Sequence, residues 1–78
     1  MINYKTLDHI ERSNEVIVQK IEGGWGLRQR LNQMGIHVGD TILVKRSGIL
    51  GGPIHIQIHG MDVALGRGMA RKIIVKEE

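Results

Sequence analysis

The sequence predicts a small, mainly β domain: a five-stranded barrel with one α-helix inserted after the first strand. Three observations support this prediction. Short runs rich in Val and Ile alternate with glycine-containing turns along the chain, as expected for short strands. Only residues 25–34 show apolar residues at helical spacing. A chain of 78 residues builds one small core, which predicts a single domain over residues 1–78, and barrel closure removes the sheet edges that so short a chain cannot cover.

The first half of the chain predicts a lead-in and one strand before the helix. Residues 6–10 read as a short helical turn, with Thr6 as its N-cap. The β-branched run from Val16 to Ile21 predicts the first strand. Because both sides of this strand carry apolar residues, the pattern leaves open which side is buried.

The helix is predicted from spacing and from its end signal. Leu27, Leu31 and Met34 recur at intervals of four and three residues, which places them on one helical face. Arg28 belongs to the opposite, solvent-exposed face. Gly35 stands where a helix end favours a residue with left-handed backbone.

The second half of the chain predicts the other four strands. Residues 54–59 alternate isoleucine with polar residues throughout, which indicates one buried and one exposed face. Gly60-Met61 reads as a two-residue hairpin turn of type II′, with glycine first. The remaining predictions are strands at residues 41–46, 62–65 and 72–76, a loop at 47–52, and a short helical turn at 66–71.

Composition excludes several classes of protein. The absence of cysteine removes disulfide frameworks, thiolate metal sites and cysteine nucleophiles. The N-terminus lacks the pattern of a secretory signal, and no apolar run approaches the roughly 20 residues that cross a bilayer. We therefore expect a soluble, cytoplasmic protein that does not insert into membranes. A formal charge of +3 is compatible with acidic partners or nucleic acid and selects neither.

Four blocks of sequence together carry a family resemblance. They are residues 21–24, residues 27–40 with the core Arg30-Leu31-x-x-Met34-Gly35-Ile36-x-x-Gly39, the loop Gly51-Gly52-Pro53, and residues 63–75 with Val63-Ala64-Leu65-Gly66. In this order and spacing the chain resembles the FeoA family over about residues 7–75. The resemblance implies an SH3-like barrel with an inserted helix, and strands two to five resemble the meander of that fold.

The resemblance also implies a role. Proteins of the family that this chain resembles are small and cytosolic, and they accompany FeoB, a membrane transporter for ferrous iron with a GTP-binding domain. A similar domain occurs in iron-dependent transcriptional repressors, where it contacts the repressor's own chain. Neither setting implies an enzyme or a cofactor.

The four histidines raise the question of a metal site. His55 and His59 share a face of their strand, but they lie about 13 Å apart at about 3.3 Å per residue, which is too far for one zinc ion. His9 and His37 are isolated in the sequence, and the fold decides whether one of them approaches the pair. The residues alone predict no metal site and no bound cofactor. Direct iron binding stays open as an alternative, to be tested by a metal-dependent shift in melting temperature that is lost when His55 and His59 become alanine.

Other chemistries lack the residues they need. The glycine-rich segments do not match a phosphate-binding P-loop. Single-strand nucleic-acid binders stack bases on aromatic side chains, whereas Trp25 and Tyr4 are the only aromatic residues here. No serine has a neighbour suited to act as its base, so no catalytic residue is predicted.

The remaining signal is for protein docking. Trp25 lies between Gly24 and Gly26 at the helix entrance, and tryptophan is enriched at binding hot spots. Ile49 and Leu50 are apolar residues in a glycine-flanked loop, and Arg28 adds electrostatic steering. Two alternatives are open: Trp25 plugs an end of the barrel, and Ile49-Leu50 folds over the core.

We therefore expect a regulatory accessory protein of ferrous iron uptake that binds the cytoplasmic part of FeoB through Trp25, Arg28, Ile49 and Leu50. The partner would recruit it to the inner face of the membrane. The alternative is a small regulatory barrel that contacts nucleic acid or an iron-dependent repressor. Self-association remains open.

Overall fold

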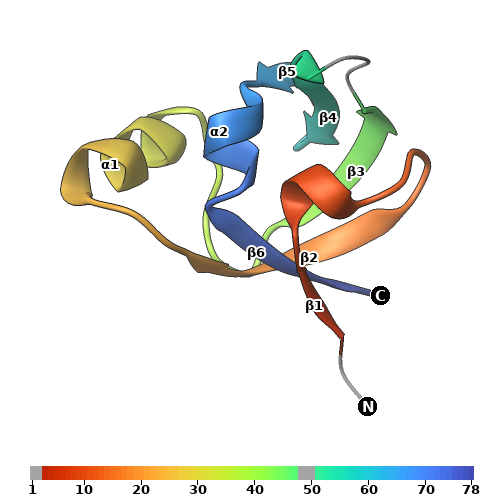
Figure 1. The fold of residues 1–78 in the computed structure, drawn as a ribbon, viewed down its shortest axis with the longest axis horizontal. Coiled ribbons are helices and arrows are strands. Elements are labelled where there is room, and N and C mark those ends of the chain that lie inside the picture. Colours follow the sequence, from red (N-terminus) through yellow and green to blue (C-terminus); the bar gives the residue numbers. More distant parts are fainter. Residues whose placement is uncertain (1–2, 48–50) are drawn as a thin grey trace.

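The computed structural model describes residues 3–47 and 51–78. Figure 1 shows a strongly bent antiparallel sheet with one longer helix at its side. The strand order is β1-β6-β2-β3-β4-β5. In chain order the elements are β1 (Tyr4–Thr6), the 3₁₀ helix η1 (Leu7–His9), β2 (Glu15–Ile21), α1 (Trp25–Gln33), β3 (Thr41–Arg46), β4 (Ile54–Ile58), β5 (Met61–Leu65), α2 (Arg67–Ala70) and β6 (Ile73–Glu77).

The predicted five-stranded closed barrel is wrong in two respects. A sixth strand, β1, precedes the five predicted ones and pairs with β6 from Tyr4↔Lys76 to Thr6↔Ile74. It is three residues long and none of them is buried, so it has no apolar alternation that sequence reasoning could detect. In the described part of the chain, β1 and β5 form the two edges of a sheet that is not closed. The helix α1 consequently follows the second strand.

Among residues 3–47 and 51–78, the buried apolar residues are all aliphatic, and they form a core inside the bend of the sheet. On β2 it takes Val16 and Val18, which answers the question that the pattern had left open. The register of β2 against β6 shifts between Val18 and Lys20, and Ile21 beyond this bulge packs against the core. The fully buried apolar residues are Leu7, Ile10, Val16, Val18, Leu31, Ile36, Ile42, Val44, Ile54, Ile56, Ile58, Leu65, Ala70, Ile73 and Val75.

The hairpin between β4 and β5 differs from the predicted one. Ile58 pairs with Met61, so the two turn residues are His59 and Gly60. Both have positive φ, at 52° and 75°, which is the requirement of a type I′ turn. The predicted type II′ turn at Gly60-Met61 was therefore wrong by one residue. The sequence assigned His59 to the strand because it continues the alternation of isoleucine with polar residues, and a histidine gives no indication of left-handed backbone.

The helix α1 begins and ends close to the predicted positions. Leu31 is its one fully buried residue, while Leu27 and Met34 pack against the rim of the core. Gly35 has φ +83°, and the backbone N–H of Ile36 donates to the carbonyl of Leu31 over 3.0 Å, which closes the helix end. Among the described residues, no helix has the length and apolar character needed to cross a membrane.

Candidate functional site

Trp25 opens α1 and projects into solvent. Its exposed fraction is 78%, so it does not plug an end of the folded sheet. Gly24, the N-cap, and Gly26 lie on either side of it and have no side chains that would cover the indole ring. Exposure of a whole indole costs free energy that burial against a partner recovers.

Two arginines flank a row of side chains on the outer side of α1. Trp25, Gln29 and Gln33 follow one another at intervals of four residues, which aligns them along the helix. At about 100° per residue, Arg28 and Arg30 lie on opposite sides of Gln29. All five residues are exposed, and we call them the α1 face.

The α1 face borders a shallow hollow of about 750 Å³. The residues around this hollow are Trp25, Gly26, Gln29, Arg30, Gln33 and Met34. They supply an indole, two amides, a guanidinium group and a thioether, and none of them is acidic. Because no carboxylate or other general base is among them, this arrangement suits binding rather than proton transfer.

The other half of the predicted docking surface lies outside the described residues. Ile49 and Leu50 belong to the segment between Ser47 and Gly51. A contribution of these two residues to docking therefore stays a prediction, as does their alternative role as a cover for the core.

A second polar cluster surrounds Asp40, directly before β3. The backbone N–H of His37 donates to Asp40 Oδ2 over 2.8 Å, and the ring Nδ1 of His37 lies 3.3 Å from the same oxygen. His59 Nε2, from the β4–β5 turn, lies 3.4 Å from Asp40 Oδ1. Asp40 therefore links the loop after α1 to the hairpin at the far end of the sheet.

The surroundings of Asp40 lower the pKa of its carboxyl. Partial burial alone raises the pKa, but the hydrogen bond from the His37 backbone and the contacts with the rings of His59 and His37 outweigh it. The carboxylate is consequently the form that the fold stabilises.

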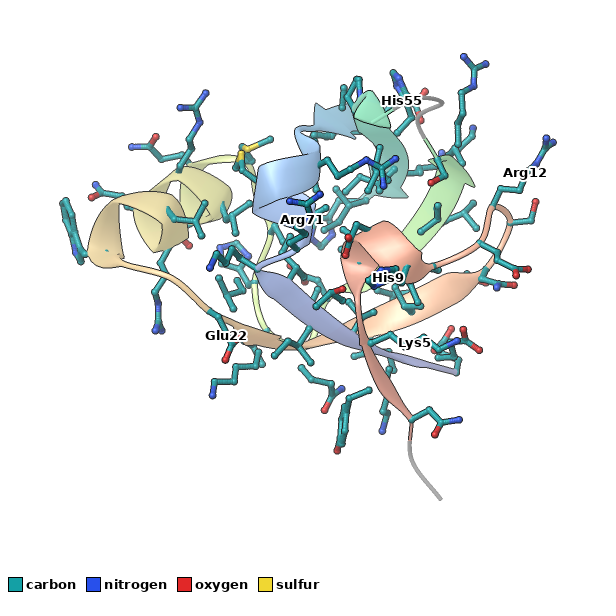
Figure 2. The ribbon with its side chains drawn as sticks, viewed as in Figure 1. Lys5, His9, Arg12, Glu22, His55 and Arg71 are labelled. Atoms are coloured by element: carbon teal, nitrogen blue, oxygen red, sulfur yellow. The ribbon has the colours of Figure 1, made fainter. Side chains whose placement is uncertain are left out.

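A third cluster holds α2 against η1. Asp8, whose side chain is 6% exposed, accepts a hydrogen bond from Thr6 Oγ1 over 2.5 Å. Arg71 Nε, next to α2, lies 3.6 Å from Asp8 Oδ2. Figure 2 shows Arg71 on the side of α2 that faces the 3₁₀ helix carrying His9. Thr6 thus acts through Asp8 and makes no capping hydrogen bond with the backbone of η1.

The histidines do not assemble a metal site in the part of the chain that the structure describes. There, no group of three metal-ligating side chains is placed to share one ion. His55 is exposed on β4, while His59 turns toward Asp40. The fold does bring His37 and His59 to one carboxylate, which the sequence had left open.

Sequence reasoning singled out Trp25 and Arg28 but missed Arg30, Asp8 and Asp40. Arg30 was the easiest to recover, since it is two residues from Arg28 on a predicted helix. Asp8 and Asp40 gain their roles from residues distant in sequence, Arg71 and His59, so no local pattern indicates them.

Comparison with known proteins places the chain in a family. The FeoA domain model matches residues 5–77. A protein of Methanocaldococcus jannaschii, whose name proposes that it is an Fe(2+) transport protein A, is 43% identical over 67 residues, which are 86% of this chain and 79% of that protein.

Solved structures agree with the family model. The crystal structure of an iron uptake regulatory protein, FeoA, has a TM-score of 0.89 and 34% identity, and covers 97% of this chain and 99% of its own. A manganese-dependent transcriptional repressor has a TM-score of 0.91 at 19% identity, over 100% of this chain and 44% of its own. This second likeness concerns the SH3-like fold alone. On the family model and the sequence identity, the chain belongs to the FeoA domain family.

Proposed function

We propose that this protein is a non-catalytic accessory protein of ferrous iron uptake and that it binds the cytoplasmic region of a FeoB-like transporter through the α1 face. Family membership supports the link to iron transport, because the relatives matched over most of the chain are named for it. The observation that carries the docking role is the exposure of Trp25, at 78%. The partner would hold the protein at the cytoplasmic side of the membrane.

The polar residues around Trp25 support docking over burial in the protein's own core. Protein interfaces combine an aromatic or arginine anchor with a polar rim that excludes water. Trp25 supplies the anchor, and Gln29, Gln33 and the two arginines supply the rim. Ile49 and Leu50 are proposed as a second contact of the same kind.

The test is a calorimetric titration of this protein with the purified cytoplasmic region of its own organism's FeoB-like transporter, with and without guanine nucleotide. Trp25→Ser removes the proposed anchor, and we expect the affinity to fall by at least about tenfold. Tyr4→Ser is the matched control, because Tyr4 is also an exposed aromatic residue, at 57%, but lies on edge strand β1. Ile49→Asp/Leu50→Asp tests the loop separately.

The two possible results lead in different directions. Saturable binding that is weakened by Trp25→Ser and retained by Tyr4→Ser supports the proposal. No binding in either nucleotide state contradicts it for this region of the transporter. A titration with mixed-sequence DNA then examines the alternative, a regulatory barrel that contacts nucleic acid, whose affinity would fall steeply with salt because phosphate contacts release counterions.

A further inference from the structure

The positive charge of the α1 face is not used within the fold. The chain contains no acidic residue between Glu22 and Asp40, while Arg28 and Arg30 lie inside this stretch. Across residues 3–47 and 51–78, neither arginine forms an ion pair. Lys5, Lys20, Lys45 and Arg71, by contrast, each lie within 4 Å of a carboxylate oxygen. The two arginines of α1 are thus adjacent cations that the fold leaves available.

The two acidic residues that border this stretch are engaged elsewhere. Glu22 lies 3.8 Å from Lys20 Nζ on β2. Asp40 contacts His37 and His59. Neither carboxylate is paired with an arginine of α1, so the α1 face carries two positive charges and no negative charge. Such a surface favours an acidic partner.

We propose that the α1 face binds an acidic peptide segment, which lies along the row of Trp25, Gln29 and Gln33 with its carboxylates toward Arg28 and Arg30. This inference rests on the proposed function, since such a segment would belong to the docking partner. Guanidinium groups bind carboxylates through paired hydrogen bonds. One apolar side chain of the segment would pack on the Trp25 ring. The backbone of the segment would form hydrogen bonds with the side-chain amides of Gln29 and Gln33.

A peptide fits this surface better than an anionic membrane does. Helices that lie in a membrane surface bury a continuous apolar face in the lipid. The apolar face of α1 is directed to the core through Leu27 and Leu31, which leaves Trp25 as the only large apolar group on the α1 face. A single indole and two amides instead match an extended, partly polar chain.

The test uses Trp25, the only tryptophan of the protein, as a reporter at the site itself. The probe is a synthetic peptide of glutamates around a central leucine, and the matched peptide has serine in place of each glutamate. We expect the acidic peptide to shift the Trp25 emission to shorter wavelength and the serine peptide to leave it unchanged. Affinity should fall as NaCl rises from about 0.05 M to about 0.5 M, because screening weakens exposed charge pairs.

Variants of equal charge identify the surface. Arg28→Gln/Arg30→Gln should weaken peptide binding on the order of tenfold or more. Arg12→Gln/Arg46→Gln removes the same charge from the opposite side of the molecule, where Figure 2 places Arg12 far from α1, and should leave binding unchanged. Far-ultraviolet circular dichroism checks that both variants keep the fold.

Each outcome decides the question. Equal binding of the serine peptide, or equal weakening by both pairs of substitutions, would overturn the proposal. So would an emission shift with phosphatidylglycerol vesicles and none with the acidic peptide, which would assign the face to lipid. A parallel titration with the transporter's cytoplasmic region separates the two hypotheses: salt-independent binding there, with no response to the peptide, keeps the proposed function and overturns this inference.

Discussion

The two α-helices that the structure describes lie beside arginine residues with opposite roles. Arg71, directly after α2, lies 3.6 Å from the buried carboxylate of Asp8 and so helps to hold α2 on η1. Arg28 and Arg30 on α1 project into solvent beside an exposed tryptophan. The arginine next to α2 serves the fold, whereas those of α1 are available to a partner. The difference lies in long-range contacts and not in local sequence.

The largest expected effect on stability concerns Leu31, which packs α1 against the core. Leu31 is the only residue of this helix that is fully buried, so Leu31→Ala should lower the free energy of unfolding by about 2–5 kcal/mol. Urea denaturation measures this change. Trp25→Ala on the same helix should change stability by less than about 0.5 kcal/mol, as is usual for exposed sites. A comparable loss from both substitutions would contradict the division of α1 into a core side and a docking side.

The contrast between the arginines predicts the next largest effect. Asp8→Ala removes a buried carboxylate together with its hydrogen bond from Thr6, and we expect it to cost about 1–3 kcal/mol. Arg28→Gln and Arg30→Gln should each stay within about 0.5 kcal/mol of the parent protein. Thermal melts of the three variants check this order. If either α1 arginine proved as costly to replace as Asp8, that arginine would serve the fold as well.

Asp40 holds the loop after α1 as Asp8 holds α2, and its lowered pKa makes this contact dependent on pH. The carboxyl has a lower pKa in the folded protein than its ordinary value of 3.8. The contribution of Asp40 to the free energy of unfolding is therefore complete above about pH 5, and it is lost as the pH falls below that ordinary value. Asp40→Asn should therefore lower stability by about 1 kcal/mol near neutral pH. The difference in the free energy of unfolding between Asp40→Asn and the parent protein should disappear at acidic pH. Urea denaturation at a series of pH values measures this difference. A gap that is constant with pH would show that the charge of Asp40 is not responsible.

The sequence was sufficient for the elements that follow a local pattern. The isoleucine alternation of β4, the β-branched run of β2 and the leucine spacing of α1 each reflect burial on one side of a single element, and each appears at nearly the expected residues. The strand β1 escaped prediction because backbone pairing with β6 alone defines it. Barrel closure was wrong since it depends on how far the two edge strands lie apart, which no segment encodes by itself.

The candidate site was predictable only in part, for a similar reason. An indole between two glycines led to the prediction of docking at Trp25, which stays a prediction, without any knowledge of the fold. Whether that indole would be buried or exposed depended on the direction in which α1 leaves β2. The positive φ of Ser13, at 72°, and of His59, at 52°, was equally difficult to predict. Glycine is the residue that usually indicates a positive φ, and neither position carries it.

The smallest expected effect separates folding from docking on the two helices. Gly26 lies in α1 beside the hollow, and Gly68 lies in α2; a Cβ atom at either position would meet nothing within 4 Å. Alanine favours helix over glycine, so Gly26→Ala and Gly68→Ala should each stabilise the protein by about 0.5–1 kcal/mol.

Their effects on docking should differ, because only Gly26 borders the α1 face. An added methyl group there would keep a partner chain from close approach to the helix backbone, which glycine permits. Gly26→Ala should therefore raise the melting temperature and weaken binding to the transporter's cytoplasmic region, while Gly68→Ala should raise the melting temperature alone. Calorimetric titration of both variants provides the measurement. If Gly26→Ala bound as tightly as the parent protein, the partner would contact only the side chains of the α1 face. Docking would then not require glycine at position 26.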